Sequence, residues 1–369
     1  MKVAEFIGLQ FFESMYLFVL FCIPIVVAQK YIGTIVLTIL ILLAVSTFLR
    51  KLLYKPIEIK GQGVLITGCD TGFGNAIANR FDAMGFTVFA GCLNPECEGA
   101  KRLKESTTGQ MHILKMDITD DADVRSALEY VTKTDQATGC GLWALVNNAG
   151  VNFLGDIDFC TMEMYHRIMN VNLFGMVRTT KAFLPLLRKS KGRVVNVTSV
   201  RGRCVFPVAS AYTMAKFAGE AFSDGLRLEM RKFGMKVVLV EPGNFGGATG
   251  MLNEKSLAIM KRDFNTMWTE AGEEVRETYG KEYLDRLFEG AKGTSSTSYP
   301  TLGPVLDALE DAVINQSPRI RYLVDGGNGL FDVFCMLARL NSFLPEVVMD
   351  WMVSRLLSRE LPPLKSEQK

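Results

Sequence analysis

The chain has 369 residues, of which 49% are hydrophobic, with a mean hydropathy of +0.18 and a formal net charge of +2. The length allows one large α/β domain with appendages, and the near-neutral charge argues against a nucleic-acid-binding protein. Eight scattered cysteines without a CxxC pair, together with only two histidines, favour neither a disulfide scaffold nor a metal site.

Two uncharged apolar stretches come first, at residues 14–29 and 31–49. At 1.5 Å per residue they would extend about 24 Å and about 28 Å, against a hydrocarbon core of about 30 Å. Sparse charge before the first stretch argues against a cleaved signal peptide, and the absence of arginine before Arg50 argues against a mitochondrial transit peptide. We expect residues 1–53 to be a retained membrane anchor of one or two helices, with two passes slightly favoured.

Basic residues crowd the end of the second stretch: Arg50, Lys51, Lys55 and Lys60. Positive charge beside a span tends to stay in the cytosol. The sequence therefore predicts a domain that faces the cytosol, on the endoplasmic reticulum in preference to a mitochondrial membrane. Residues 54–62 are expected to be a polar linker.

Strands and helices then alternate. Apolar runs predict strands at residues 64–67, 86–90, 111–116, 142–146, 193–197, 236–240 and 321–324. Helical spacing predicts helices at 72–84, from 119–121 onward, and at 162–187, 210–233 and 305–314. Such a pattern is typical of an α/β, Rossmann-type doubly wound parallel sheet of about seven strands, here over residues 63–328.

The C-terminal residues 329–369 are expected to form a helical extension that is broken near Pro345. Its apolar side chains could cap the core or form a membrane-contacting lip beside the substrate entrance, and the sequence favours neither.

A glycine-rich turn follows the first predicted strand and opens a helix. Unpaired N–H groups at a helix N-terminus bind phosphate, and glycines let the backbone approach a pyrophosphate closely. The turn is therefore predicted to bind a dinucleotide through Gly68, Asp70, Thr71, Gly72, Phe73 and Gly74.

Ligands bind parallel sheets at the carboxyl ends of the strands. Asn147, Ala149 and Gly150 end the fourth strand, so we expect them to contact the same dinucleotide. Asp117 follows the third strand and is placed to accept a hydrogen bond from the adenine amine. A helix cap is the alternative for this residue.

The cofactor preference depends on the turn and on the end of the second strand. NADP needs a basic partner for its 2′-phosphate, but the turn contains Cys69 and Asp70, and no basic residue follows the second strand before Lys101. Asp70 would repel a phosphate. The acid that usually binds the ribose 2′-hydroxyl is missing at Cys92 and Leu93. NAD is favoured over NADP, mainly because a phosphate partner is absent.

Four polar residues form a candidate catalytic set. Tyr212 and Lys216 are one helical turn apart and share a helix face, Ser199 ends the fifth strand, and Asn172 lies in the preceding helix. A free tyrosine is too weak an acid to act as a base, but a neighbouring ammonium favours tyrosinate. Tyr212 would then exchange a proton with a substrate oxygen that Ser199 holds. Lys216 would also bind the nicotinamide ribose, and Asn172 would position a relay water.

These motifs resemble the short-chain dehydrogenase/reductase family over residues 63–324. The segments 89–92, 141–146 and 241–245 resemble the branch of 3-hydroxybutyrate dehydrogenase, retinol dehydrogenases and NAD-linked hydroxysteroid dehydrogenases, including the 17-beta type. The resemblance implies a seven-stranded Rossmann domain, often a homodimer, and the residue roles above. It also includes Pro242 and Gly243 among the cofactor motifs and adds Thr249 as a contact to the carboxamide or phosphates.

The substrate loop is expected at residues 244–303. It carries aromatic and methionine side chains that suit a bulky apolar ligand: Phe245, Met251, Leu252, Met260, Met267 and Trp268. Core packing is the alternative for each of them. With the expected anchor, these residues favour a lipophilic alcohol or ketone of the steroid or retinoid class.

Two other functions stay open. A small hydroxy acid such as 3-hydroxybutyrate would need a cation, which Arg201 or Arg203 could supply, unless both are solvent-facing loop charges. A non-catalytic, membrane-tethered scaffold on the same fold is the second alternative.

Overall fold

The computed structural model describes residues 11–139, 141–249, 254–293, 297–329 and 332–357. By its internal contacts the chain divides into two compact units, Met1–Pro56 and Ile57–Lys369.

The first unit is helical, with a π-helical turn η1 (Phe18–Cys22) and the helix α2 (Ile23–Leu53). Tyr31 leaves helical geometry at φ −127°, so the chain bends there. Among the described residues, no single helix is both long and apolar enough to cross a membrane. Phe11–Val27 and Tyr31–Ser46, which are bent by 101°, reach that length and composition only as a pair.

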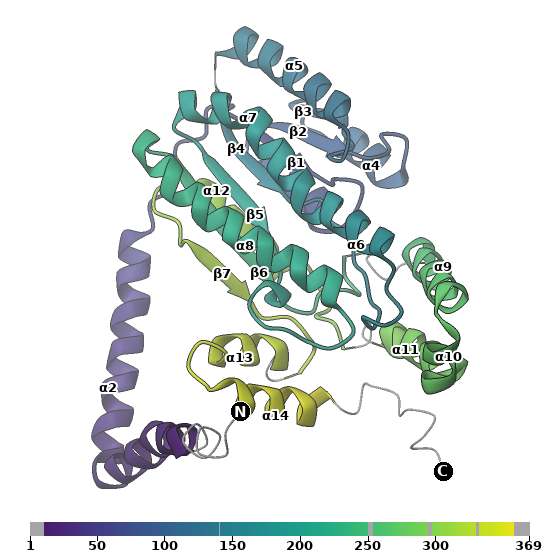
Figure 1. Ribbon diagram of the computed structural model, residues 1–369. Helices are drawn as coiled ribbons and strands as arrows, with labels where there is room; N and C mark the ends of the chain where they lie inside the picture. Colours follow the sequence, from purple (N-terminus) through teal and green to yellow (C-terminus); the bar gives the residue numbers. More distant parts are fainter. Residues whose placement is uncertain (1–10, 140, 250–253, 294–296, 330–331, 358–369) are drawn as a thin grey trace. The chain divides into compact units, whose positions relative to one another are not determined.

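The second unit is built on one parallel sheet of seven strands in the order β3-β2-β1-β4-β5-β6-β7 (Figure 1). The strands are β1 (Gly63–Thr67), β2 (Thr87–Cys92), β3 (Met111–Lys115), β4 (Leu142–Asn147), β5 (Arg193–Val197), β6 (Lys236–Pro242) and β7 (Arg321–Val324). The predicted parallel α/β sheet is confirmed. β2 and β6 each run two residues beyond the expected ends.

Helices cover both faces of this sheet. One face carries α3 (Gly72–Ala83), α4 (Glu98–Ser106) and α12 (Gly303–Ile314); the other carries α5 (Asp121–Thr138), α7 (Met176–Ser190) and α8 (Ser210–Met230). Successive strand residues point to opposite faces. Val64 and Ile66 accordingly join the first core, whereas Leu65 joins the second.

The expected helix at 162–187 is interrupted. It consists of α6 (Met162–Met169), the π-helical segment η2 (Asn170–Gly175) and α7. A π segment inserts an extra residue into the turn, which hydrophobic periodicity does not reveal, and such segments frequently occur at functional sites. This segment contains Asn172.

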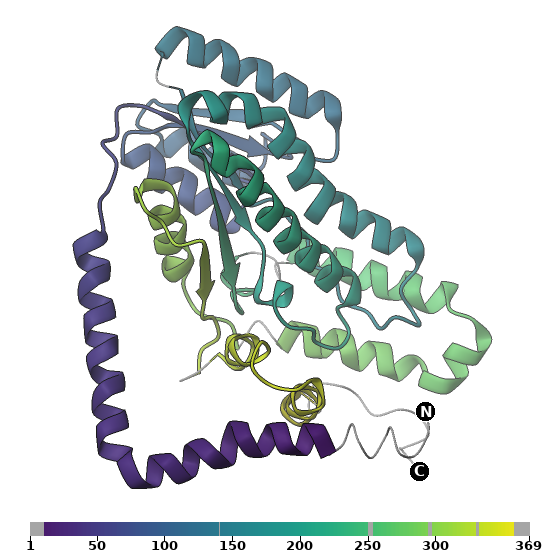
Figure 2. The ribbon, with the colours of Figure 1, turned by 60° about the vertical axis from the view of Figure 1, so that its left-hand side comes forward.

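The remaining helices lie beyond the carboxyl ends of the strands (Figures 1 and 2). They are α9 (Glu254–Glu270), α10 (Glu273–Tyr279), α11 (Lys281–Gly293), α13 (Val333–Leu340) and α14 (Glu346–Leu357). The C-terminal pair caps the loop after β5, because Leu337 and Met349 pack with Val200 and Phe206. On the outer side, Trp351 remains exposed.

Candidate active site

The glycine turn between β1 and α3 can be built only from glycine at three positions. Gly68 and Gly72 have φ of +72° and +63°, in the left-handed region. A Cβ on Gly74 would lie 2.3 Å from the Gly68 carbonyl oxygen. The side chain of Thr71, the residue before α3, caps no N–H group within the described part of the chain. The turn therefore fits a pyrophosphate, which the first N–H groups of α3 would bind.

Thr67 and Asn148 join this turn to the end of β4. The Thr67 hydroxyl oxygen accepts from the backbone N–H groups of Asn148 and Ala149, each at 3.0 Å. The Asn148 amide donates to the carbonyls of Thr67 and Gly68 at 2.9 and 3.1 Å. Ala149 thus lies against the turn, and its contact with the dinucleotide stays a prediction. Neither Thr67 nor Asn148 was among the site residues predicted from the sequence. Asn148 could have been found, because it lies between Asn147 and Ala149, which were both predicted.

The side chain of Asn147 binds other parts of the protein. Its side chain is buried, and its Nδ2 donates to Thr180 Oγ1 at 2.9 Å and to Asn196 Oδ1 at 2.8 Å. These bonds tie β4 to β5 and α7. The side chain is therefore directed into the protein, and only its backbone remains available for the expected cofactor contact.

The carboxylate of Asp70 binds the backbone that directly follows β2. It accepts from the backbone N–H groups of Leu93 and Asn94, each at 2.9 Å. The end of β2 has no acidic residue at Cys92 or Leu93. Asp70 of the glycine turn therefore supplies a negative charge there.

Asp117 makes a local turn. Its Oδ1 accepts from the backbone N–H and the hydroxyl of Thr119 at 2.8 and 2.7 Å. The cap of α5 is Asp120, so the helix-cap alternative for Asp117 is wrong. The predicted adenine contact stays a prediction.

Lys216, Asn172 and Gly150 meet at one point. A Cβ on Gly150 would lie 3.1 Å from Asn172 Oδ1 and 3.7 Å from Lys216 Nζ. Asn172 is held by the backbone of Val151, accepting its N–H at 2.8 Å and donating to its carbonyl at 2.9 Å. Lys216 donates to the Val197 carbonyl at 3.2 Å. The structure thus brings together residues from the loop after β4, from η2 and from α8 that lie up to 66 positions apart in the chain.

Tyr212 is buried beside this group. Its ring centroid lies 5.5 Å from Lys216 Nζ, and both side chains belong to the same face of α8. Ser199 opens the short 3-10 helix η3 (Val200–Gly202), where its Oγ accepts from the Arg201 N–H at 3.2 Å and lies 3.5 Å from the Pro242 carbonyl. The ammonium beside the phenol is placed to stabilise negative charge on that ring's oxygen.

The segment after β6 lies against the turn. A Cβ on Gly72 would lie 2.7 Å from the Thr249 carbonyl oxygen, and Phe73 contacts Phe245 edge-on at 5.7 Å. Gly243 is enclosed by the C-terminal segment, since a Cβ there would lie 2.1 Å from Asp332 Oδ2. Thr249 is therefore adjacent to the glycine turn, and its contact with the cofactor stays a prediction.

Several expected substrate contacts instead pack in the interior. Phe245, Met260 and Met267 are buried, the two methionines in a cluster with α11. Trp268 is half-buried against the same cluster. Met251 and Leu252 lie outside the described residues. Core packing, which the sequence left as the alternative, therefore accounts for the described members.

The two arginines after Ser199 are engaged with the protein. Arg203 Nη1 lies 3.4 Å from Glu241 Oε1. The Arg201 guanidinium stacks over the rings of Phe206 and Phe334 at 5.5 and 6.0 Å. Both arginines are thus partly exposed and partly engaged with the protein, and a substrate carboxylate would have to compete with these contacts.

Comparison with known proteins identifies the family. The family model for short chain dehydrogenase matches residues 62–259. The mitochondrial D-beta-hydroxybutyrate dehydrogenase of Rattus norvegicus is 41% identical over 265 residues, which cover 71% of this chain and 76% of that protein. Short-chain dehydrogenase/reductase family 9C member 7 of Bos taurus is 38% identical over 297 residues, covering 80% and 90% respectively. The 3beta-hydroxysteroid dehydrogenase dhs-16 of Caenorhabditis elegans is 36% identical and covers 81% and 76%.

A solved short-chain dehydrogenase from Streptomyces avermitilis has the same fold, with a TM-score of 0.53, 24% identity, and coverage of 82% of this chain and 98% of that one. This protein belongs to the short-chain dehydrogenase/reductase family, in the branch that its motifs resemble. It is an oxidoreductase that acts on hydroxyl groups with NAD or NADP.

Proposed function

We propose that this protein is a membrane-anchored, NAD-dependent dehydrogenase that interconverts a lipophilic alcohol and its ketone or aldehyde, of the steroid or retinoid class. The observation that carries the proposal is the meeting of Lys216, Asn172 and Tyr212 beside the carboxyl ends of β4 and β5, on the strand edge that carries the glycine turn.

Each residue has a distinct task in this chemistry. The bound nicotinamide supplies or accepts the hydride. Tyr212 accepts the alcohol proton during oxidation and returns it during reduction, while Lys216 stabilises the charge on the tyrosine oxygen. Ser199 donates a hydrogen bond to the substrate oxygen. Asn172, fixed by Val151, holds the water that carries the proton away from Lys216.

The substrate class is tested by a paired assay. The purified full chain is given NAD with a panel of steroid and retinoid alcohols, and separately with 3-hydroxybutyrate. We expect turnover of a lipophilic alcohol. Good oxidation of 3-hydroxybutyrate with no lipophilic turnover would support the alternative suggested by the 41% identical hydroxybutyrate relative. Dinucleotide binding without any turnover would support a scaffold.

The preference for NAD rests on Asp70. Its carboxylate stands at the end of β2, where a 2′-phosphate would meet its negative charge. Asp70→Asn is expected to raise the NADP-to-NAD ratio of kcat/KM about 10- to 100-fold, because it removes one like-charge interaction of a few kcal/mol. Glu96→Gln, an exposed charge change in the loop that follows, is the matched control and should leave the ratio unchanged. An unaltered ratio in the Asp70 variant would contradict the assignment.

The membrane anchor is supported by the first unit. Its described helices carry exposed large apolar side chains: Phe11, Val26, Ile32, Leu37, Leu40, Leu43 and Phe48. We expect the full chain to stay in the membrane pellet after alkaline carbonate extraction, with the second unit digested by protease added outside sealed microsomes. Release by carbonate would contradict the anchor, and protease protection would contradict the cytosolic orientation.

A homodimer through α8 is supported by an exposed apolar stripe on this helix. Met214, Phe217 and Leu228 are exposed along one side, and Gly225 lies between them with open space around it. Light scattering of the detergent-solubilised chain should give twice the chain mass, and Phe217→Asp should halve it. A wild-type monomer at micromolar concentration would rule the dimer out.

A further inference from the structure

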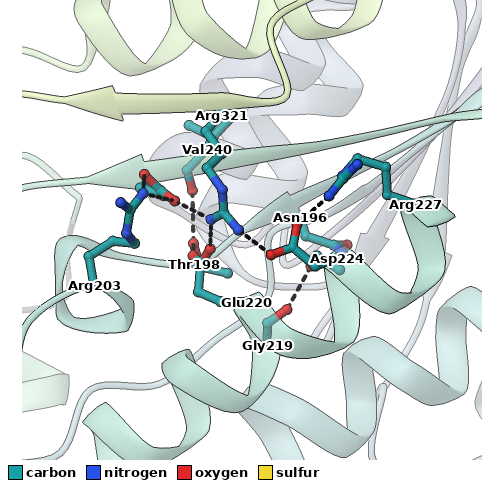
Figure 3. Close-up of polar contacts among 11 residues, drawn as sticks. Asn196, Thr198, Arg203, Gly219, Glu220, Asp224, Arg227, Val240 and Arg321 are labelled. Atoms are coloured by element: carbon teal, nitrogen blue, oxygen red, sulfur yellow. Dashed lines mark hydrogen bonds and ion pairs between the residues drawn. The ribbon is translucent and has the colours of Figure 1, made fainter. Parts of the chain in front are cut away.

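Charged side chains from three elements meet around the guanidinium of Arg321 (Figure 3). Arg321 of β7 donates through Nη1 to Glu241 Oε1 at 2.7 Å and to Glu220 Oε2, and through Nη2 to Asp224 Oδ2 at 2.5 Å. Glu241 is fully buried and Glu220 is 6% exposed. We refer to these four residues as the Arg321 cluster. One guanidinium thus connects α8, β6 and β7.

Two further arginines balance the charge of the cluster. Arg203 lies 3.4 Å from Glu241, and Arg227 lies 3.1 Å from Asp224. Buried charges persist only when they are paired and hydrogen-bonded. The arginines therefore offset part of the cost of burying these carboxylates.

The cluster fixes the segment that contains Ser199 from both sides. Thr198, the residue before Ser199, donates through its hydroxyl to Glu220 Oε1 at 2.5 Å. On the other side, a Cβ on Gly202 would lie 3.1 Å from the Lys216 carbonyl oxygen and 3.2 Å from Glu220 Oε1. Residues 198–202 are therefore pressed onto one turn of α8, with Glu220 in contact at either end.

The same face of α8 also carries the catalytic pair. Tyr212, Lys216 and Glu220 follow one another at four-residue spacing and share a helix face. Glu241 directly precedes Pro242, whose carbonyl oxygen lies 3.5 Å from Ser199 Oγ. The cluster thus contacts α8, β6 and the residue before Ser199.

We propose that the Arg321 cluster positions the active site, and that Glu220, acting through Thr198 and Gly202, sets the place of Ser199 relative to Tyr212 and Lys216. This inference rests on the proposed function for its kinetic consequences. Glu220 is a positioning residue, since it contacts no reacting atom.

Proton uptake by Glu220 should disturb this arrangement. Burial and the charge of Glu241 raise the pKa of Glu220 to about 7. The charged groups that act on it are Glu241 from β6 and Arg321 from β7, which pair in turn with Arg203 and Asp224. Ionised Glu220 accepts from both Thr198 and Arg321, whereas a protonated carboxyl gives up one of these bonds. Positioning is therefore complete above pH 7 and lost as the pH falls through 7.

The stability contribution of Glu220 has the opposite sign. An unperturbed glutamate has a pKa of about 4.3. Because the pKa of Glu220 is raised in the folded state, protonation stabilises the fold at low pH, and this contribution is lost as the pH rises through about 7. The fold thus already accommodates a neutral side chain at this position, so Glu220→Gln is expected to fold.

The test compares Glu220→Gln with wild type from pH 5.5 to 9. At pH 8.5 we expect kcat to fall about 10-fold or more, since misplacing a reacting group by about 1 Å can cost about 100-fold. The wild-type acid limb near pH 7 should disappear in the variant. The dissociation constant for NADH, measured by fluorescence, should change less than about twofold, because the glycine turn is untouched. Amide hydrogen exchange in residues 197–202 should become faster.

The matched control is Glu310→Gln. This residue makes a comparable ion pair, with Arg80 at 3.1 Å, between α12 and α3 on the other face of the sheet. It should leave the pH profile and the exchange of residues 197–202 as in wild type.

The outcomes separate this inference from the proposed function. A wild-type chain that turns over no alcohol or carbonyl compound would overturn the proposed function, and hydrogen exchange would still decide the positioning. Unchanged exchange in Glu220→Gln would overturn the positioning. So would a lowered melting temperature with kcat and pH profile like wild type, because that result indicates a purely structural role.

Discussion

Replacing Tyr212 by phenylalanine is expected to lower kcat about 1,000-fold or more with any substrate that the wild type oxidises. The phenylalanine ring fills the same buried space, so the fall in kcat reports the contribution of the hydroxyl group alone. General acid–base catalysis by one positioned group typically contributes about 10²- to 10⁴-fold. Turnover is measured by NADH formation at saturating alcohol and NAD.

Two controls define that result. NADH binding, followed by fluorescence titration, should stay within about twofold of wild type, since the glycine turn is intact. Tyr130 lies on α5, and Tyr130→Phe removes a hydroxyl 3.0 Å from Nδ1 of His112 on β3, so it should leave kcat unchanged. A Tyr212→Phe enzyme with more than about a tenth of the wild-type kcat would show that another group moves the proton.

Replacing Gly74 by alanine is expected to abolish dinucleotide binding over the accessible concentration range. The new Cβ would lie 2.3 Å from the Gly68 carbonyl oxygen and 2.5 Å from Asn148 Nδ2, so the turn must move away from α3. Overpacking of this kind costs about 1–3 kcal/mol of stability. We expect an NADH dissociation constant raised at least about 100-fold and a lower melting temperature.

Gly303→Ala is the matched control for this change. Gly303 begins α12, and a Cβ there would lie 3.7 Å from Thr301 Oγ1, which is an ordinary contact. Affinity should be unchanged, and stability unchanged or raised by up to about 1 kcal/mol, because alanine favours helix more than glycine does. Normal NADH binding by Gly74→Ala would show that the turn does not hold the pyrophosphate.

The expectations that depended on local sequence were accurate. Every predicted strand of the sheet is present, and β5 and β7 match to the residue. Apolar runs separated by helical periodicity leave a chain few ways to bury its surface. The turn at Gly68 and Gly72 was equally readable, because positive φ at both positions requires a residue without Cβ.

The expectations that depended on distant partners were less accurate. Asn147 was predicted to contact cofactor, yet its side chain binds Thr180 and Asn196, 33 and 49 positions away. The helix through Asn172 was expected to be regular, but η2 is π-helical and packs tightly, with Gly175 against Ile118. Neither contact leaves a periodic trace in the sequence.

The sequence by itself determined the alternation of strands and helices, the glycine turn between β1 and α3, and the pairing of Tyr212 with Lys216 on one helix face. These features arise from residues within a few positions of one another, where backbone sterics and helical periodicity suffice. Only the tertiary structure decided that Asp70 binds the backbone after β2. The same holds for Arg321, which pairs with carboxylates from α8 and β6. Both follow from strand order, because β1 lies beside β2 and β6 beside β7, and that order results from burial of the whole sheet.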